Sequence, residues 1–495
     1  MSGAAPGVRS SDGDASALSN ADLAPTPPDA RTWGTWHVAA LWIGMAVCIP
    51  SYMLCAGMIG AGLAWWQAIG TVLLGNLIVL VPMILNGHAG TKYGIPFPVL
   101  VRASFGTSGA HVPSIARGLV ACGWFGIQTW IGGAAISQIL ASMGWLDPAA
   151  WQPLPLLGIS LPQLACFLGF WAIHLVIVLR GIQSIKVLES WASPFLLLCG
   201  VALLAWAVRA VPKTADLLPP ERLPADTSAW SIFLPQLTAM VGFWATLSLN
   251  IPDFTRYCRS QRVQASGQLL GLPLTMTLFA FIGVAVTSAT VVVFGEAIWD
   301  PVVLVGRLDA SPTIVSVALL AIVLATLTTN LAANVVSPAN GFSNLAPRRI
   351  GFRGGALITC IIGVVMMPWK LLETLQGYVF TWLIGYSALL GPIAGIMLAD
   401  YFLLRRTRLE VNALYDPRGS FAGVRWSAMI ALAVGVAPNL PGFLNAVSGR
   451  SIAPPIFDSI YSWAWFVGLP LAGVVYWALA RGGVESSNRP AHARA

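Results

Sequence analysis

Polar side chains that could bind a flat solute occur inside a long apolar stretch in the first third of the chain. Trp124 and Gln128 are four residues apart, and residues at this spacing share one face of a helix. An indole next to an amide suits a flat heterocycle, because the indole stacks on the ring and the amide hydrogen-bonds to its edge. Tryptophans also gather at membrane interfaces, so an aromatic belt is the alternative. The position of Gln128 well inside the apolar stretch favours solute binding.

A second polar cluster lies in an apolar stretch further along the chain. Ala325, Thr328 and Thr329 share one helical face, and Asn330 and Asn334 occupy the neighbouring face. Hydroxyl and carbonyl oxygens without formal charge suit a hard monovalent cation, and amides offer a donor and an acceptor to a solute. Attachment of one helix to another through Thr and Asn is the alternative.

Ionisable groups are scarce within the apolar stretches. No acidic residue is expected near the middle of a span, and Glu189, one turn into the predicted fifth span, is the nearest exception. The absence of acidic residues from the middle of the predicted spans argues against a carboxylate proton relay and a cationic substrate, and it favours a neutral, polar solute. His174 alone lies deep in a span, and a single histidine there is more often packed and hydrogen-bonded than a ligand. No catalytic motif is present, so the sequence predicts neither an enzyme nor a cofactor beyond a coupling ion.

The composition indicates the environment in which these residues lie. Of 495 residues, 57% are apolar and 9% are charged, whereas a soluble protein carries about 25% charged residues. The chain is therefore predicted to be an all-α polytopic membrane protein whose partners are the lipid bilayer and a small solute. Nucleic-acid binding, a secreted disulfide scaffold and a soluble two-domain enzyme are excluded. The seven cysteines form no CxxC pair and are interpreted as packing residues.

Apolar runs of about 20 residues, the length that crosses a bilayer, predict twelve transmembrane helices. They are expected at residues 37–62, 65–85, 112–141, 161–179, 184–208, 230–250, 267–295, 313–336, 354–368, 375–402, 424–445 and 460–480.

The basic residues indicate the orientation of the twelve spans. With a cytosolic N-terminus, 21 Lys and Arg residues fall inside and 6 outside, out of 27. This is the bias of the positive-inside rule, so both termini are predicted to be cytoplasmic in a multi-pass protein of the cell membrane. Residues 1–32 are expected to be a disordered tail, 33–405 a ten-helix transport core, 406–481 two additional helices and 482–495 a second tail. A monomer is expected.

Two predicted spans contain helix-breaking residues. The first contains Pro50 next to Ser51, and the interrupted stretch of the sixth is Val241–Pro252, with Gly242 near its start. Pro removes a backbone donor, and the freed carbonyls and amides become available at membrane depth. Breaks five spans apart predict two inverted five-helix repeats with broken helices 1 and 6 and a site between them. The alternative is that Gly and Pro are simply more frequent in transmembrane helices.

At these residues the chain resembles the nucleobase-cation symport-1 family of secondary transporters. The resemblance covers nearly all of residues 30–480 and rests on six segments: residues 86–98, 102–106, 123–130, 250–257, 334–338 and 390–401. The family implies a 5+5 inverted-repeat core plus two helices. It also implies sodium- or proton-coupled uptake of nucleobases, allantoin, hydantoins or related vitamins by alternating access.

The resemblance implies roles for individual residues. Tryptophans of the third and sixth helices sandwich the heterocycle in family members, and these positions match Trp124 and Trp244. A third-helix glutamine matches Gln128, and an eighth-helix asparagine matches Asn334.

A sodium site is implied in the same way. Its ligands in a hydantoin-transporting member match the carbonyls of Gly44, Val47 and Ala325 and the hydroxyls of Thr328 and Thr329. One of those hydroxyls belongs to Ser in that relative, and Thr retains the oxygen. Sodium is therefore the expected coupling ion, with proton coupling and facilitated transport through a channel as alternatives.

Two departures bear on the substrate. Phe243 replaces a Gly of the hydantoin transporter, and Cys48 stands where relatives carry Gln or Asn. Both positions are expected to contact substrate, and a bulkier, less polar pocket disfavours bulky hydantoins. Residues 377–387 are most similar to the branch that contains allantoin and uracil permeases. A uracil-like nucleobase is therefore the favoured substrate, with allantoin second.

Overall fold

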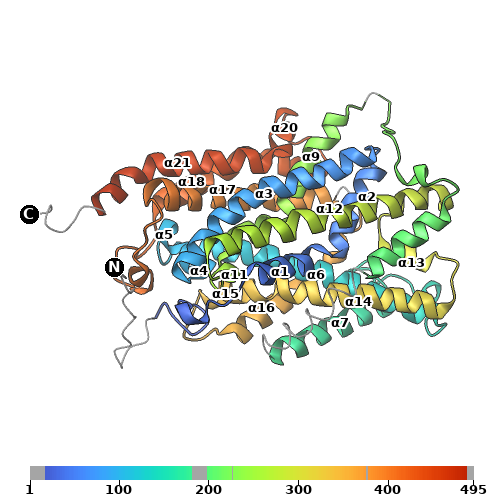
Figure 1. The fold of residues 1–495 in the computed structure, drawn as a ribbon, viewed down its shortest axis with the longest axis horizontal. Coiled ribbons are helices and arrows are strands. Elements are labelled where there is room, and N and C mark those ends of the chain that lie inside the picture. The colour runs from blue at the N-terminus through green and yellow to red at the C-terminus, as the bar shows by residue number, and fades with distance from the viewer. Residues whose placement is uncertain (1–16, 181–197, 226, 375–376, 488–495) are drawn as a thin grey trace, which may run out of the picture.

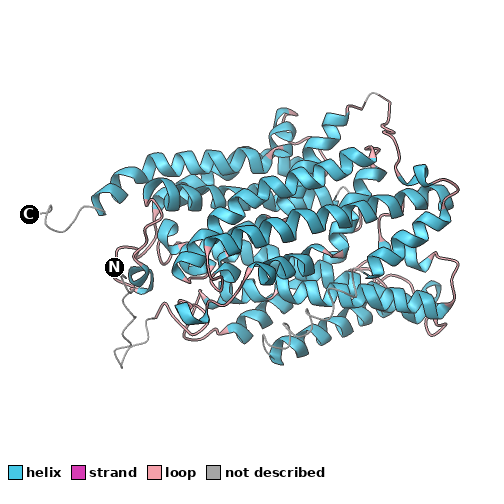
Figure 2. Ribbon diagram, in the orientation of Figure 1, coloured by secondary structure: helices cyan, strands magenta, loops and turns pink. Residues whose placement is uncertain are grey.

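The computed structural model describes residues 17–180, 198–225, 227–374 and 377–487. In this part of the chain all regular secondary structure is helical, apart from two isolated bridges (Figures 1 and 2). Most helices run along the long axis of the molecule, and the described residues nearest to the two termini, at Ala17 and Ser487, lie at the same end of the bundle. This arrangement confirms the predicted all-α membrane fold.

Eight helical segments are each long and apolar enough to cross a bilayer. They are α3 (Trp65–Tyr93), α6 (His111–Ser142), α7 (Leu161–Arg180), α12 (Gln261–Phe294), α14 and α15 (Pro312–Asn334 and Val336–Ser343), η5 with α17 and η6 (Gly377–Leu404), α18 with η8 and α19 (Trp426–Ser448), and α21 (Ala464–Ser487).

The remaining predicted spans are broken or short. The helices α1 (Thr35–Ala46) and α2 (Ile49–Gly60) form one bent span, and three shorter apolar helices cover Leu198–Ala210, α9 (Ala229–Phe243) and α16 (Phe352–Val365). Residues 184–197 of the predicted fifth span, which include Glu189, lie outside the described residues. The helices that are described match the twelve predicted spans in order and position.

The break in the first span lies directly before Pro50. Val47 and Cys48 leave the helical conformation, and α1 and α2 meet at 57°. Pro50 is the second residue of α2, where its missing N–H costs no hydrogen bond. The last carbonyls of α1 therefore have no amide partners within their own helix.

The sixth span is interrupted as well, and the break lies within the predicted stretch Val241–Pro252, two residues after Gly242. Helix α9 ends at Phe243, Trp244 is not helical, and α10 covers Ala245–Asn250. Pro252 instead begins the short helix α11 (Pro252–Thr255). The interruption thus lies at Trp244, in the middle of the span.

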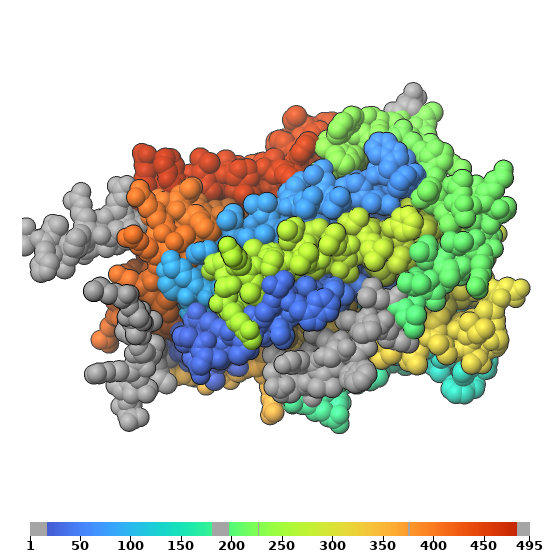
Figure 3. All heavy atoms as spheres, in the orientation of Figure 1, coloured from blue at the N-terminus to red at the C-terminus, as the bar shows by residue number. Residues whose placement is uncertain are grey.

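The outer surface of the bundle is apolar, as expected for contact with lipid tails. Leu270, Leu274 and Leu278 follow one another at four-residue spacing on α12 and are about half exposed, and Val81 on α3 is similarly exposed. In the space-filling view α3 and α12 lie side by side across one face (Figure 3). An exposed stripe of this kind would be unfavourable in water.

The sequence predicts disorder up to residue 32, and the structure differs over residues 17–32. Leu23 is fully buried, and its carbonyl accepts a hydrogen bond of 2.6 Å from the hydroxyl of Tyr415. The amide of Asn20 donates to the carbonyls of Pro347 and Ile350, and Arg256 donates to the carbonyl of Asp22. The segment is too polar to fold alone. It packs on a surface that the helices already form, where its backbone carbonyls accept hydrogen bonds from side chains of the helical core.

The two C-terminal helices are joined to the core by a buried charge cluster. Asp400, at the start of η6 (Ala399–Leu404) and near the end of its span, accepts hydrogen bonds of 2.6 Å from Arg405 and 2.7 Å from the hydroxyl of Tyr476 on α21. Helix α17 (Ile384–Leu398) packs along α21. The carboxylate therefore lies at a helix end and has both its charge and its hydrogen bonds satisfied.

Candidate functional site

The breaks of the first and sixth spans face helices α6 and α14 around a small enclosed cavity of about 30 Å³. Eleven residues line it: Met45, Cys48, Trp124, Gln128, Phe243, Trp244, Thr246, Leu247, Thr329, Ala333 and Asn334. All six residues predicted to contact substrate are among them. The cavity has room for about two water molecules, which is less than a heterocyclic ring needs.

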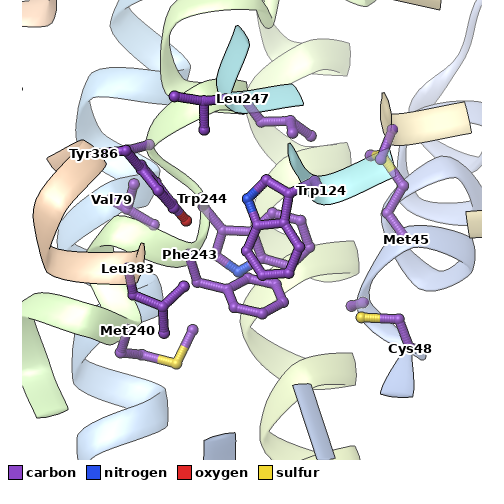
Figure 4. Packing of buried hydrophobic residues seen from close by; sticks show 14 of the residues in the cluster. Met45, Cys48, Val79, Trp124, Met240, Phe243, Trp244, Leu247, Leu383 and Tyr386 are labelled. Atoms are coloured by element: carbon purple, nitrogen blue, oxygen red, sulfur yellow. The ribbon is translucent and has the colours of Figure 1, made fainter. Parts of the chain in front are cut away.

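Aromatic rings form the wall on the side of the sixth span (Figure 4). The Phe243 ring lies next to both indoles, with ring centroids 5.1 Å from Trp124 and 4.9 Å from Trp244. Trp42 of α1 packs edge-on against Trp244 at 5.2 Å. A flat solute that stacks on the two tryptophans would therefore compete with the Phe243 ring for the same space.

The polar edge of the cavity comes from α6 and α14. Gln128 is 2% exposed, and its carbonyl oxygen has no hydrogen-bond partner. The side-chain amide of Asn334 donates to the oxygen of Asn330 at 3.0 Å, which leaves the oxygen of Asn334 without a contact in this network. An unsatisfied buried acceptor is costly, and a solute N–H would relieve that cost.

Asn330 itself has a structural role next to the cavity. Its amide donates to the carbonyl of Phe125 at 3.0 Å and lies 3.2 Å from Nε2 of His174. His174 also contacts the carbonyl of Phe170 at 2.9 Å. The histidine is buried and hydrogen-bonded, as the sequence predicts, and this network fixes the face of α14 that presents Asn334.

The predicted cation ligands come from the break in α1 and from the facing part of α14. The hydroxyl of Thr329 donates to the carbonyl of Gly44 at 3.3 Å, so the two oxygens are adjacent. The hydroxyl of Thr328 lies 3.1 Å from the carbonyl of Ala325. Val47 ends α1, three residues after Gly44. The site contains oxygens and no carboxylate, a donor set that fits a monovalent cation such as Na⁺.

Sequence reasoning missed a third aromatic contribution, from the span that begins with the π-helix η5 (Gly377–Leu383). Tyr378, Trp382 and Tyr386 all pack edge-on against Trp124, with ring centroids 6.0–6.4 Å away. The four-residue spacing of these residues in the sequence indicates that the three aromatic rings share one helical face. Figure 4 shows Tyr386 pointing toward the tryptophans.

Comparison with known proteins agrees with this arrangement. Residues 25–468 match the family described as permeases for cytosine/purines, uracil, thiamine and allantoin. The chain is 45% identical to the purine-uracil permease NCS1 of Arabidopsis thaliana, over 93% of this chain and 78% of that protein. It is 39% identical to the allantoin permease of Bacillus subtilis, over 94% and 93% of the two chains.

Solved structures share the fold. The structure of Mhp1, a nucleobase-cation-symport-1 family transporter in a closed conformation with bromovinylhydantoin bound, superimposes with a TM-score of 0.74 and 26% identity, and covers 95% of this chain and 96% of that one. A Na⁺-coupled sialic acid symporter matches with a TM-score of 0.60 at 11% identity, over 92% and 91% of the two chains. This second match shows a shared fold only. The chain therefore belongs to the nucleobase-cation symport-1 family of multi-pass membrane transporters.

Proposed function

We propose that this protein is a secondary active importer of a neutral, uracil-like nucleobase, coupled to Na⁺. The observation that carries the proposal is the single cavity at which Trp124, Trp244, Gln128 and Asn334 meet. A planar imide presents two stacking faces and an edge of alternating N–H and C=O groups. The two indoles and the two amides supply the complementary surfaces.

The substrate class is supported by the relatives and by the size of the pocket. The plant relative is named for purines and uracil, and a uracil permease of Saccharomyces cerevisiae is 28% identical over 93% of this chain. Phe243 and Cys48 narrow the pocket and contribute little polarity, since Cys48 hydrogen-bonds to Ser51 at 3.0 Å. A small ring fits this pocket better than a hydantoin with a bulky substituent.

Allantoin is the second candidate substrate. The bacterial allantoin permease aligns over nearly the full length of both chains, and allantoin presents the same alternation of N–H and C=O groups. Its hydantoin ring carries a urea substituent, so it requires more room beside Phe243 than uracil does.

The coupling ion is assigned to the oxygens of Gly44, Val47, Ala325, Thr328 and Thr329. These oxygens join the break of α1 to α14. A cation bound there would hold the two helices in one register, so it would favour the conformation that binds substrate. The positive-inside bias of the basic residues supports a cytoplasmic position for both termini and the adjoining end of the bundle. We assign the protein to the cell membrane as a monomer.

Uptake of labelled uracil, allantoin, hydantoin and cytosine in the same cells, with and without sodium, tests the proposal. We expect sodium-stimulated uptake of uracil, with allantoin as a weaker competitor. Uptake of none of the four, or uptake of uracil that ignores sodium and collapses with a protonophore, would contradict it.

A further inference from the structure

A second layer of polar side chains lies beside the cavity, toward the end of the bundle that carries both termini. Arg117 precedes Trp124 by seven residues on α6, which is about two turns or 10 Å along the helix. Asn250 follows Trp244 by six residues at the end of α10. The helices that line the cavity therefore contribute this layer as well.

Arg117 brings more hydrogen-bond donors to the layer than its surroundings use. It is 1% exposed, and its Nε donates to the side-chain oxygen of Asn250 at 3.2 Å. Both of its terminal nitrogens lack a hydrogen-bond partner, and so does the amide nitrogen of Asn250. Two buried side chains that touch each other thus hold three unsatisfied donor groups. Burial of an unsatisfied charged group is costly, so another molecule is expected to accept these hydrogen bonds at some stage.

The neighbouring carboxylate does not accept these hydrogen bonds. Asp253 follows Asn250 by one helical turn, but one of its oxygens accepts a hydrogen bond of 2.8 Å from the backbone N–H of Phe97. The other accepts a hydrogen bond from the hydroxyl of Ser337. Asp253 therefore ties α11 to the segments around it. Its charge interacts with that of Arg117, but the terminal nitrogens of Arg117 have no hydrogen-bond acceptor.

Other buried arginines at this end of the bundle show what a structural arginine looks like. Arg405 pairs with Asp400 and donates to the carbonyl of Ala103. Both terminal nitrogens of Arg102 donate to oxygens of the protein. Arg117 is as deeply buried as Arg102, but only its Nε has a partner. A role in holding the fold together does not explain this difference.

We propose that Arg117 and Asn250 form a second, transient binding site for the carbonyl oxygens of the transported heterocycle, on its path from the cavity to the cytoplasm. The inference rests on the proposed function, since it requires that the solute carry carbonyl groups. The three free groups are all donors, so they complement acceptors, and hydrogen bonds between a guanidinium and an oxygen are among the stronger ones. The layer is closed in this structure, so the solute reaches it when α6 and α10 separate there.

Transport measured from each side of the membrane tests this site. KM for labelled uracil and allantoin is determined in right-side-out and inside-out vesicles, together with Tm of the purified protein. The variants are Arg117→Met and Arg117→Lys. The control is Arg307→Met, because Arg307 is half exposed beside Glu296 at the opposite end of the bundle.

We expect Arg117→Met to raise KM at the cytoplasmic side by about 10- to 100-fold and to change KM at the outer side less than twofold. Arg117→Lys should give an intermediate value, since it retains the charge and one donor group. Tm is measured because the charges of Arg117 and buried Asp253 interact, so a loss of stability must be separated from a change at the site. The control should match the wild type on both sides.

Three outcomes would overturn the inference. Equal changes of KM on the two sides would place the effect in the shared cavity. A lowered Tm with transport reduced in proportion in both directions would make Arg117 a structural residue. An unchanged KM on the cytoplasmic side would mean that water alone satisfies the donors. Failure of the proposed function is distinct from these, because the wild type itself would then transport neither probe.

Discussion

The sharpest test of the ion assignment compares two threonines on α14. Thr329→Val keeps the shape of the side chain and removes the hydroxyl that lies 3.3 Å from the carbonyl of Gly44. Loss of one oxygen partner in a buried site costs about 1–3 kcal/mol, so the apparent affinity for Na⁺ should fall by roughly 5- to 150-fold. Because binding of the two ligands is linked, the sodium stimulation of substrate binding should fall at moderate sodium and return at high sodium.

Thr326→Val is the matched control for this experiment. Its hydroxyl is fully buried and bonds only within its own helix, to the carbonyls of Ile322 and Val323 at 2.9 and 3.0 Å. The same atom is therefore lost from the same helix at a similar depth, without a change at the cation site. Thr328→Val should behave like Thr329→Val, although its hydroxyl also contacts carbonyls of its own helix.

The assay is equilibrium binding of labelled uracil to purified protein across a range of sodium concentrations at constant ionic strength. Identical sodium curves for the Thr329 and Thr326 variants would refute the assignment. Binding to the wild type that does not depend on the sodium concentration would refute it as well, and would favour proton coupling.

Further predictions concern the cavity and its support. Trp124→Ala should weaken substrate binding by roughly 5- to 150-fold, since stacking on one face contributes about 1–3 kcal/mol, whereas Trp130→Ala, on the same helix but packed against other aromatic rings, should not. Gln128→Leu should lose affinity without losing expression, and Gln128→Glu should change the order of preferred substrates in competition assays; an unchanged order would argue against a role for Gln128 in reading the ring edge. Phe243→Gly should admit substituted hydantoins as competitors of uracil, and no gain of hydantoin binding would show that Phe243 does not limit pocket size. Leu23→Ala should lower the free energy of unfolding by about 2–5 kcal/mol if the N-terminal segment is packed as described, measured as a shift in Tm.

The sequence predicts the order of the spans and the break in the first one well. An apolar run of about 20 residues has few structural alternatives, and Pro50 marks a helix start at that position. The break in the sixth span lies inside the predicted stretch Val241–Pro252, but the sequence does not indicate Trp244 as its position, and Pro252 begins α11. The break at Trp244 accompanies ring contacts with Trp42 and Phe243, which bring together two spans distant in sequence.

The candidate site was predictable to a similar degree. The residues of the third, sixth and eighth spans meet at one cavity, as their positions on helical faces suggest. The spacing of Trp382 and Tyr386 indicates a shared aromatic face, but the contact of that face with Trp124 depends on how the tenth span packs against the third. The packing of Leu23 was missed for a related reason, since its contacts lie on helices encoded far downstream.

That separation has a consequence for the synthesis of the protein. Leu23 and Tyr415 are 392 residues apart, and Asn20 lies 330 residues before Ile350. A ribosome adds about 5–20 residues per second, so the N-terminal segment emerges roughly 20–80 s before its last partner does. It must remain undocked while ten spans enter the membrane. Its low hydrophobicity keeps it from aggregating during that interval, and its docking becomes one of the last steps of assembly.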